Sequence, residues 1–337
     1  MTVQQAIRAL VEGRDLDQEQ AAAIAREIMV GNATAAQIAA LLVGLRAKGE
    51  TVEEIAGFAQ AMRQKAGCVR ARSDNVIDTC GTGGDGIGTF NISTVSAFVA
   101  AGAGCKVAKH GNRSVSSACG SADLLRTLGV DIEMSPEQAA QCIDEVGVGF
   151  LFALQYHPGA RYAAGPRREI GVRTIFNTLG PLLNPAGAKR QLMGIYDRKL
   201  IEPIAEVLHR LGAVHCLVVH GEDGLDEITI AGKTLATELR KGALRSFSIS
   251  PMDFGLDLAS LEDIRGGDAE ENAEIARRVL AGEPGPARDV VLLNAGAAIY
   301  VGGRADSIAS GVRQAAAAID TGSARGMLEA LIVRSRE

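Results

Sequence analysis

The 337-residue sequence has few cysteines, and their spacing argues against the common uses of that residue. The six cysteines are scattered along the chain with no C-x-x-C pair; they are Cys68, Cys80, Cys105, Cys119, Cys142 and Cys216. A structural zinc site or a disulfide framework usually shows closer, regular spacing. We therefore expect buried, reduced thiols.

The sequence also lacks the features of a membrane, secreted or nucleic-acid-binding protein. It has no run of about 18 apolar residues, and its first residues, MTVQQAIRALVEGRD, do not follow the layout of a signal peptide. The net charge is −5, so there is no overall excess of positive charge to attract nucleic acid or an acidic membrane surface. We expect a cytoplasmic protein with a globular composition, 47% hydrophobic and 22% charged, that fills one large domain or two smaller ones.

Glycines divide the first 67 residues at constant 18-residue intervals, at Gly13, Gly31, Gly49 and Gly67. Each follows a helical pattern, at the position where a glycine ends a helix. Thr51-Val52-Glu53-Glu54 is a capping box, and Thr34 and either Asp15 or Asp17 can cap the two preceding helices. The residues between the glycines do not match, so the interval reflects similar helix lengths. We predict a small all-helical domain over residues 1–71.

From about residue 75, short apolar runs alternate with helical stretches, which indicates an α/β domain over residues 72–164 and 191–337. We predict strands at Val76-Ile77, Cys105-Ala108, Gly149-Phe152, Val214-Val219 and Val290-Leu293. We predict helices at Ser121-Leu128, Pro136-Val146, Ile201-Leu211, Glu271-Ala281 and Ala305-Thr321. Residues 165–190 are rich in proline, glycine and arginine, and we expect them to cross back to the helical domain.

A glycine-rich run, DTCGTGGDGIGTFNIST, spans residues 78–94 and contains the G-x-G-x-x-G spacing of dinucleotide-binding folds at Gly81, Gly83 and Gly86. It lies between a predicted strand and a predicted helix, which makes an anion site at the helix N-terminus. A dinucleotide site also needs an acidic residue about 20 residues further on. The chain instead continues with the basic run Lys109-His110-Gly111-Asn112-Arg113, so the dinucleotide interpretation fails there.

Asp85 also argues against a dinucleotide. A carboxylate beside phosphates repels them unless a cation lies between, and this points to a magnesium-bound polyphosphate.

Four motifs occur in order: GTGGDGIGTFNIST, KHGNRSVSSACGSAD, YHPGARYAAGPRREIGVRTIFNTLGPLLNP and HGEDGLDEIT. Together they resemble the anthranilate phosphoribosyltransferase family, over nearly the whole chain. The resemblance implies a small helical domain and a large α/β domain with a mixed central sheet flanked by helices. It also implies transfer of a phosphoribosyl group from phosphoribosyl pyrophosphate (PRPP) to anthranilate in tryptophan biosynthesis, and a homodimer formed through the helical domain.

The resemblance implies PRPP contacts in two segments. The first holds Gly81, Gly84, Asp85, Thr89, Asn91, Ile92, Ser93 and Thr94; the second holds Lys109, His110, Gly111, Asn112, Arg113, Ser114, Val115, Ser116, Ser117 and Ser121. Glycines allow the backbone to approach phosphate, and the cationic, amide and hydroxyl groups of the second segment suit an anion. Taken alone, the first segment could be a tight turn capped by Asn91 or Ser93, and the second a solvated basic turn.

The resemblance makes Asp226 and Glu227, helped by Ser93, the ligands of two Mg²⁺ ions on the pyrophosphate. Taken alone, this acidic pair could simply be solvated, and we expect both carboxylates to be solvent-accessible. The anthranilate site implied by the resemblance holds Gly81, Asn112, Arg167, His110 and His157, with Arg167 facing the anthranilate carboxylate. Arg168 and Arg173 are expected to pair with helix ends or acidic neighbours.

We expect catalysis by positioning and electrostatics, with no residue assigned a covalent or general-base role, because the anthranilate amine is neutral at pH 7. Three alternative functions fit the sequence less well. A nucleoside phosphorylase of the same fold would need no paired metal carboxylates, and a non-catalytic nucleic-acid-binding relative would show a basic surface and lost metal ligands. A dinucleotide oxidoreductase is disfavoured by the basic run from Lys109 to Arg113 and by Asp85.

Overall fold

The computed structural model describes residues 1–113 and 118–337 of the chain. The chain begins with a helical bundle made of α1 (Val3–Val11), α2 (Gln18–Met29), α3 (Ala35–Lys48) and α4 (Val52–Lys65). Capping boxes begin all four helices, at Thr2, Asp17, Thr34 and Thr51, so three predicted caps are confirmed, with Asp17 rather than Asp15 capping α2.

The glycines that follow the first three helices have the left-handed φ predicted for helix ends, at Gly13, Gly31 and Gly49. Gly67 differs, because α4 ends at Lys65 and the Gly67 N–H donates to the Tyr156 carbonyl at 2.9 Å. That bond attaches the end of the bundle to a segment 89 positions further along the chain (156 − 67).

The α/β part is built on a sheet that has seven strands in the described part of the chain, in the order β3-β2-β1-β4-β5-β6-β7. The strands are β1 (Val76–Gly81), β2 (Lys106–Gly111), β3 (Val148–Phe152), β4 (Arg190–Gly194), β5 (His215–Gly221), β6 (Thr234–Arg240) and β7 (Ala243–Ile249). Strands β1 to β5 are parallel, while β6 and β7 are antiparallel. The sheet is therefore mixed, as expected.

The remaining helices cover the sheet or connect its strands. They are α5 (Ile92–Gly102), α6 (Ser121–Thr127), α7 (Pro136–Gln141), α8 (Ala153–Tyr156), α9 (Arg161–Ile170), α10 (Phe176–Leu179), α11 (Ile201–Arg210), α12 (Ala269–Leu280), α13 (Pro286–Val301), α14 (Ile308–Asp320) and α15 (Ser323–Arg334). A π-helical turn, η1 (Cys142–Val146), extends α7, and 3₁₀ turns form η2 (Pro158–Ala160), η3 (Gly180–Leu183), η4 (Arg198–Leu200), η5 (Pro251–Phe254) and η6 (Leu261–Ile264).

One predicted strand is wrong, and three strands were not predicted. Val290-Leu293 lies inside α13, where every residue from Val290 to Val301 is buried, so the run shows no helical periodicity. The sequences of β4, β6 and β7 show no clear strand pattern. Strand β4 is only five residues long, and β7 is mostly exposed at the edge of the sheet.

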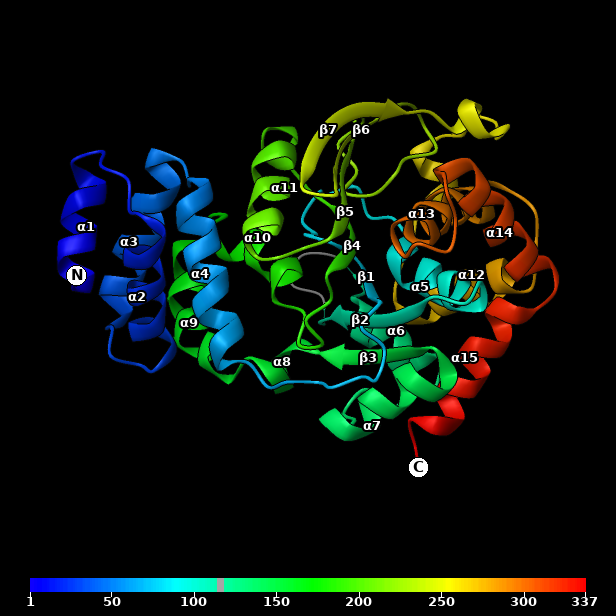
Figure 1. Ribbon diagram of the computed structural model, residues 1–337, viewed down its shortest axis with the longest axis horizontal. Helices are drawn as coiled ribbons and strands as arrows, with labels where there is room; N and C mark the ends of the chain where they lie inside the picture. The colour runs from blue at the N-terminus through cyan, green and yellow to red at the C-terminus, as the bar shows by residue number, and fades with distance from the viewer. Residues whose placement is uncertain (114–117) are drawn as a thin grey trace.

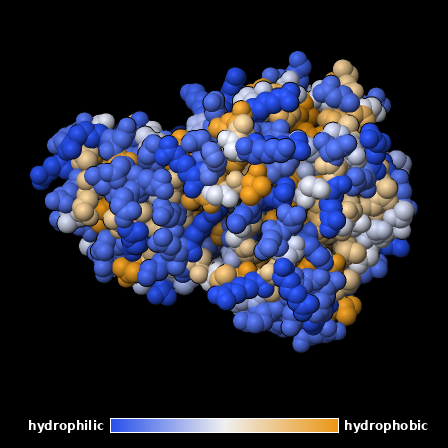
Figure 2. All heavy atoms as spheres, viewed as in Figure 1, coloured by the Kyte–Doolittle hydropathy of each residue, from blue (hydrophilic) through white to orange (hydrophobic). Residues whose placement is uncertain are grey.

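Two hydrophobic cores lie on the two sides of the sheet. Helices α5, α13 and α15 pack together in the larger core, and α4 and α11 pack in the other one, which joins the bundle to sheet residues such as Met193 and Val218. Helix α9 contacts α2 and α3, so part of the 165–190 stretch lies against the bundle (Figure 1). Figure 2 shows a mostly hydrophilic face with small apolar patches near the junction of bundle and sheet. Among the described residues, no helix has the length and apolar character to cross a bilayer.

Candidate active site

Three of the four sequence motifs lie where parallel strands end. The glycine loop follows β1, the basic loop follows β2, and the Asp226-Glu227 loop follows β5. The carboxyl ends of parallel strands lie at one edge of a sheet, where α/β proteins bind ligands. The fold therefore gathers at one edge residues that are about 145 positions apart in sequence (226 − 81).

The glycine loop is shaped to accept the Asp226 carboxylate. A Cβ on Gly81 would lie 2.4 Å from Asp226 Oδ2, and one on Gly194 would lie 1.5 Å from the Asp226 carbonyl oxygen. The Gly83 N–H donates to Asp226 Oδ2 at 2.6 Å. Gly81 therefore permits the close approach of a carboxylate from another loop, a role that the motif alone did not reveal.

Asp226 and Glu227 are buried, with 8% and 7% of their surface exposed, so the expectation of solvent-accessible carboxylates is wrong. Burial raises the pKa of Asp226 well above its usual value, and the charges of Glu227 and Asp85 act in the same direction. Burial also raises the pKa of Glu227 to about 7, opposed by the Lys109 ammonium and by hydrogen bonds from Ser93. The three carboxylates thus repel one another in a site with low access to water.

Such a cluster suits a divalent cation. No group of three His, Cys, Asp or Glu side chains among residues 1–113 and 118–337 is arranged to hold a metal by itself. Mg²⁺ commonly binds to one or two carboxylates and completes its shell with waters and substrate phosphates. Two buried carboxylates whose pKa values are raised partly by neighbouring carboxylates therefore fit Mg²⁺ that arrives with a polyphosphate.

The start of α5 lies beside this cluster. Ser93 lies near Glu227, where its side chain and backbone act to lower the pKa of that carboxylate, and the Thr79 hydroxyl donates to the Ser93 carbonyl at 2.9 Å. The Thr94 hydroxyl is buried and has no partner among the described residues. Ile92 is 1% exposed, and its backbone N–H donates to the Phe90 carbonyl at 2.7 Å.

Asn91 stands at the N-cap of α5 without capping it. Its side chain instead donates to the Cys119 carbonyl at 3.1 Å and accepts from Asn272 at 3.0 Å. Thr89, just before it, forms a β-bridge with Arg265. The predicted contact residues of the loop are therefore held by other parts of the α/β domain.

The end of β2 carries a buried lysine, and the loop after it begins with two exposed residues. The Lys109 ammonium donates to the Thr79 carbonyl and to the Ser93 hydroxyl at 3.3 Å, so this cation lies inside the cluster. Asn112 and Arg113 are exposed. A Cβ on Gly111 would lie 2.1 Å from the Ser121 hydroxyl, which brings Ser121 to this loop. Ser114, Val115, Ser116 and Ser117 lie outside the described residues.

His110 and His157 face each other, with ring centroids 5.3 Å apart and the rings edge to face. Burial lowers the pKa of His110 to about 3 and that of His157 to about 4. Both rings are therefore neutral at pH 7. Both Nε2 atoms are buried without a partner among the described residues, so they are available to a bound molecule.

Three of the four arginines in the 165–190 stretch, Arg167, Arg168 and Arg173, have different surroundings. Arg167 is half-buried over the ring of Phe176, at 5.2 Å, and burial lowers its pKa with no carboxylate in the described chain to oppose the effect. Arg168 is exposed. Arg173 donates to the Gly84 carbonyl of the glycine loop and lies over Tyr196 at 4.4 Å, so its predicted pairing with a helix end or acidic neighbour is wrong.

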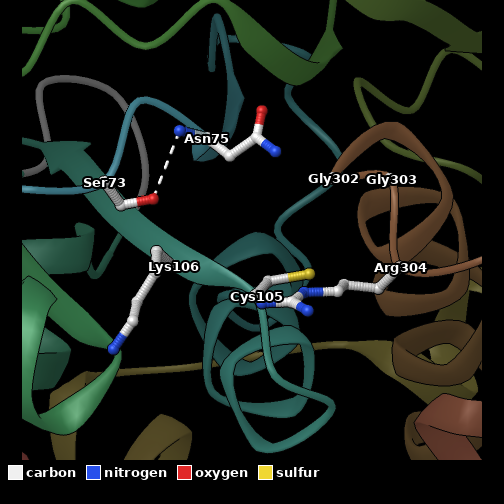
Figure 3. Close-up of a pocket in the computed structure, with 7 residues that line it drawn as sticks. All are labelled: Ser73, Asn75, Cys105, Lys106, Gly302, Gly303 and Arg304. Atoms are coloured by element: carbon white, nitrogen blue, oxygen red, sulfur yellow. Dashed lines mark hydrogen bonds between the residues drawn. The ribbon is translucent and has the colours of Figure 1, made fainter.

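A separate cavity of about 230 Å³ lies at the amino ends of β1 and β2, away from the glycine loop (Figure 3). Its lining consists of Ser73, Asn75, Cys105, Lys106, Gly302, Gly303 and Arg304. None of these seven residues is a predicted site residue, so the candidate site does not include this cavity.

Two family models match separate parts of the chain. The glycosyl transferase family, a/b domain, matches residues 73–325, and the glycosyl transferase family, helical bundle domain, matches residues 4–66. The chain is 54% identical to an anthranilate phosphoribosyltransferase of Moorella thermoacetica over 326 residues, 97% of this chain and 96% of that protein.

Two solved structures extend the likeness to three dimensions. The crystal structure of anthranilate phosphoribosyltransferase from Thermus thermophilus has a TM-score of 0.94 and 45% identity, covering 98% of this chain and 99% of that chain. The Saccharomyces cerevisiae protein in complex with PRPP and Mg has a TM-score of 0.91 and 27% identity, covering 99% of this chain and 98% of that chain. The same yeast protein has also been solved with 4-fluoroanthranilate, and that structure has a TM-score of 0.88 and 26% identity.

Proposed function

This chain belongs to the anthranilate phosphoribosyltransferases of the glycosyl transferase family, and from that premise we propose how its own residues carry the reaction. The enzyme transfers the phosphoribosyl group of PRPP to the amine of anthranilate, which yields N-(5-phosphoribosyl)anthranilate and pyrophosphate in tryptophan biosynthesis. The observation that carries the residue assignment is the buried carboxylate pair held against the glycine loop.

We propose that PRPP lies along the glycine loop and the start of α5, with Gly81, Gly84, Asp85, Thr89, Asn91, Ile92, Ser93 and Thr94 around its pyrophosphate. The left-handed glycines support this assignment, as does the Thr94 hydroxyl, which has no partner in the described part of the chain. Lys109, His110, Gly111, Asn112, Arg113 and Ser121 extend the site toward the ribose and its phosphate, together with the predicted contacts Ser114, Val115, Ser116 and Ser117.

The enzyme uses Mg²⁺, and we propose two ions held by Asp226 and Glu227 with Ser93. Their presence would neutralise the buried carboxylates and draw negative charge toward the leaving pyrophosphate. The Lys109 ammonium donates to Ser93 and acts to lower the pKa of Glu227, so it offsets part of the repulsion among the carboxylates. Gly81 lets Asp226 approach the loop that carries the phosphates.

We propose that anthranilate lies beside Gly81 and Asn112, with its carboxylate on Arg167 and its ring near His110 and His157. A half-buried guanidinium without an acidic partner among the described residues is available to a carboxylate ligand. The neutral Nε2 atoms of both histidines can accept hydrogen bonds from the aromatic amine. As C1 of the ribose becomes oxocarbenium-like, the amine attacks it, and no strong base is needed.

We further propose a homodimer that forms through the helical domain, taken as residues 1–71 with 165–190 crossing back to it. Apolar side chains on α1 and α3 support this surface: Val11 is 78% exposed and Val43 is 44% exposed. A cytoplasmic location remains a prediction.

The proposed chemistry can be tested by mixing the protein with PRPP, Mg²⁺ and anthranilate and following the fluorescence of phosphoribosyl-anthranilate. We expect turnover that stops with a chelator and returns with excess Mg²⁺. Turnover that survives the chelator would overturn the metal assignment, and cleavage of nucleosides by free phosphate would favour the nucleoside phosphorylase alternative.

A further inference from the structure

Strands β1 and β2 separate just before they reach the candidate site. They pair at Val76 with Lys106 and at Ile77 with Val107, and the described pairing does not continue. On their other sides both strands remain paired to their ends, β1 with β4 up to Gly81 and β2 with β3 up to Gly111. An opening therefore lies between two central strands, where unpaired backbone groups would be costly.

Two side chains bond across this opening. The Asn184 amide donates to the Ala108 carbonyl of β2 and to Asp78 Oδ2 of β1, both at 2.8 Å. Asp78 Oδ1 accepts the His110 backbone N–H at 3.3 Å. Asp78 is 0% exposed and Asn184 is 6% exposed, so these bonds are shielded from water.

The orientation of the Asn184 side chain is fixed. Its oxygen accepts the Ala186 N–H at 2.9 Å, which leaves the amide nitrogen for Asp78 and Ala108. Burial raises the pKa of Asp78 to about 6, while Lys109, Asn184 and His110 act in the opposite direction, so the carboxylate is mainly ionised at neutral pH. An ionised carboxylate only accepts hydrogen bonds, and both of its neighbours here donate.

Asn184 also ends the turn that contacts both histidines. It follows η3, and this turn lies beside both rings: the Gly180 backbone acts to raise the pKa of His110, and the Leu183 backbone acts to raise the pKa of His157. A shift of this turn would therefore move the backbone beside both rings together, and Asp78 holds the His110 backbone directly.

We propose that Asp78 and Asn184 act as positioning residues for the acceptor substrate, by fixing the η3 turn and the end of β2 so that His110 and His157 face anthranilate. This inference rests on the proposed assignment of both histidines to the anthranilate site. Neither Asp78 nor Asn184 needs to touch a substrate.

The pair can be tested by exchanging the carboxylate and the amide between the two positions. The variants are Asp78→Asn, Asn184→Asp and the double variant. Asp78→Asn places an amide NH₂ against a donor, and Asn184→Asp places a second carboxylate against Asp78 and the Ala108 carbonyl. In the double variant, the new amide at 78 can donate to the new carboxylate at 184 and still accept from His110. Only the Ala108 carbonyl then loses its donor.

In a two-substrate kinetic matrix, we expect each single variant to raise the KM for anthranilate by roughly 10- to 100-fold, the loss expected for one hydrogen bond to a charged group. The KM for PRPP should change little, and the double variant should recover most of the loss. Ile24→Val, in the core of the helical bundle, is the control for lost stability, and it should leave both constants unchanged. Asn184→Ala replaces any single variant that does not fold, because it removes the donor without adding charge.

A second measurement tests the pairing of Asp78 with Asn184 independently of catalytic activity. Thermal unfolding of the same four proteins without substrate gives a double-mutant cycle, and we expect the double variant to be more stable than the sum of the single losses predicts. The KM for anthranilate of the same four proteins gives a second cycle. Additive losses in the unfolding cycle and in the KM cycle, or equal rises in the KM values for the two substrates, would overturn the proposal. An inactive wild type with a coupled unfolding cycle would instead overturn the catalytic assignment and leave the pairing intact.

Discussion

At the residue scale, burial determines the chemistry of side chains whose types are already visible in the sequence. Asp226 and Glu227 were expected to be accessible, and instead they are enclosed with Asp85 and the Lys109 ammonium. His110 and His157 are held neutral by the same cause.

The first prediction concerns the carboxylate pair. Changing Asp226 to Asn and Glu227 to Gln should abolish turnover, because the charges that hold Mg²⁺ on pyrophosphate are lost. Without metal, the melting temperature should stay the same or rise, since the substitutions remove repulsion between buried carboxylates. Thermal unfolding with and without Mg²⁺ and PRPP is the measurement. A double variant that keeps full activity would contradict the assignment.

The second prediction concerns pH. His110 has a folded pKa of about 3, below its unfolded value, so the unfolded chain binds more protons as pH falls below about 6.5. The resulting stability is present above pH 6.5 and is lost as the pH falls toward 4. At pH 5 the free energy of unfolding has fallen by about 2 kcal/mol. Urea unfolding from pH 4.5 to 7.5 gives the free energy of unfolding at each pH. This free energy should rise less steeply with pH for His110→Asn than for wild type. His209→Asn, at an exposed position, should keep the wild-type slope.

The third prediction concerns the anthranilate carboxylate. Arg167→Ala should raise the KM for anthranilate by roughly 10- to 100-fold, since it removes a charge-assisted hydrogen bond. The KM for PRPP should move little, and Arg168→Ala, which changes an exposed neighbour, should change neither constant. An equal rise in both constants for Arg167→Ala would assign this arginine to the phosphate site or to the attachment of the crossing stretch.

At the element scale, the loops after the strands need glycine where another backbone or side chain approaches. Gly81 and Gly194 both lie against Asp226, one from the end of β1 and one from the end of β4. The loop after β1 then continues through left-handed glycines, and Arg173 from the crossing stretch bonds its Gly84 carbonyl. The shape of the site therefore depends on three separate segments.

The fourth prediction tests this packing. In Gly81→Ala the new Cβ would lie 2.4 Å from Asp226 Oδ2, so the carboxylate must move. We expect a severe loss of Mg²⁺-dependent PRPP binding, measured by calorimetry, with the helical content unchanged in circular dichroism. Gly326→Ala is the matched control, because a Cβ there meets no atom within 4 Å and alanine favours the helix by about 0.5–1 kcal/mol. Wild-type PRPP affinity in Gly81→Ala would show that Asp226 can move at no cost.

At the scale of the whole molecule, the helical bundle and the α/β part are joined by segments distant in sequence. Helix α9 packs on α2 and α3, the Gly67 N–H bonds Tyr156, and one hydrophobic core runs from the bundle to the sheet. The outer face of the bundle keeps exposed apolar side chains that these contacts do not cover.

The fifth prediction concerns that outer face. If α1 and α3 form a homodimer interface, Val11→Asp combined with Val43→Asp should convert the protein to a monomer, because two charges would be buried at the contact. Light scattering after size exclusion gives the mass. Leu258→Asp, at a position 51% exposed in the α/β part, is the control and should leave the mass unchanged. A wild-type monomer would exclude the dimer.

The sequence by itself determined the features that depend on local chemistry. The capping residues Asp17, Thr34 and Thr51 and the glycines after the first helices set helix ends, because those bonds are made within a few residues. The order of the four motifs was enough to indicate the family, since each carries several residue types at fixed spacing. The mixed sheet followed from that resemblance.

Only the tertiary structure decided the features that depend on neighbours from elsewhere in the chain. Val290-Leu293 looked like a strand because a helix buried on every side loses its periodicity. The enclosure of Asp226 against Gly81, the bond from Arg173 to the glycine loop and the pairing of Asp78 with Asn184 join residues from 89 to 145 positions apart. Such contacts leave no local pattern, because what each side chain meets is set by how the strands and loops are brought together.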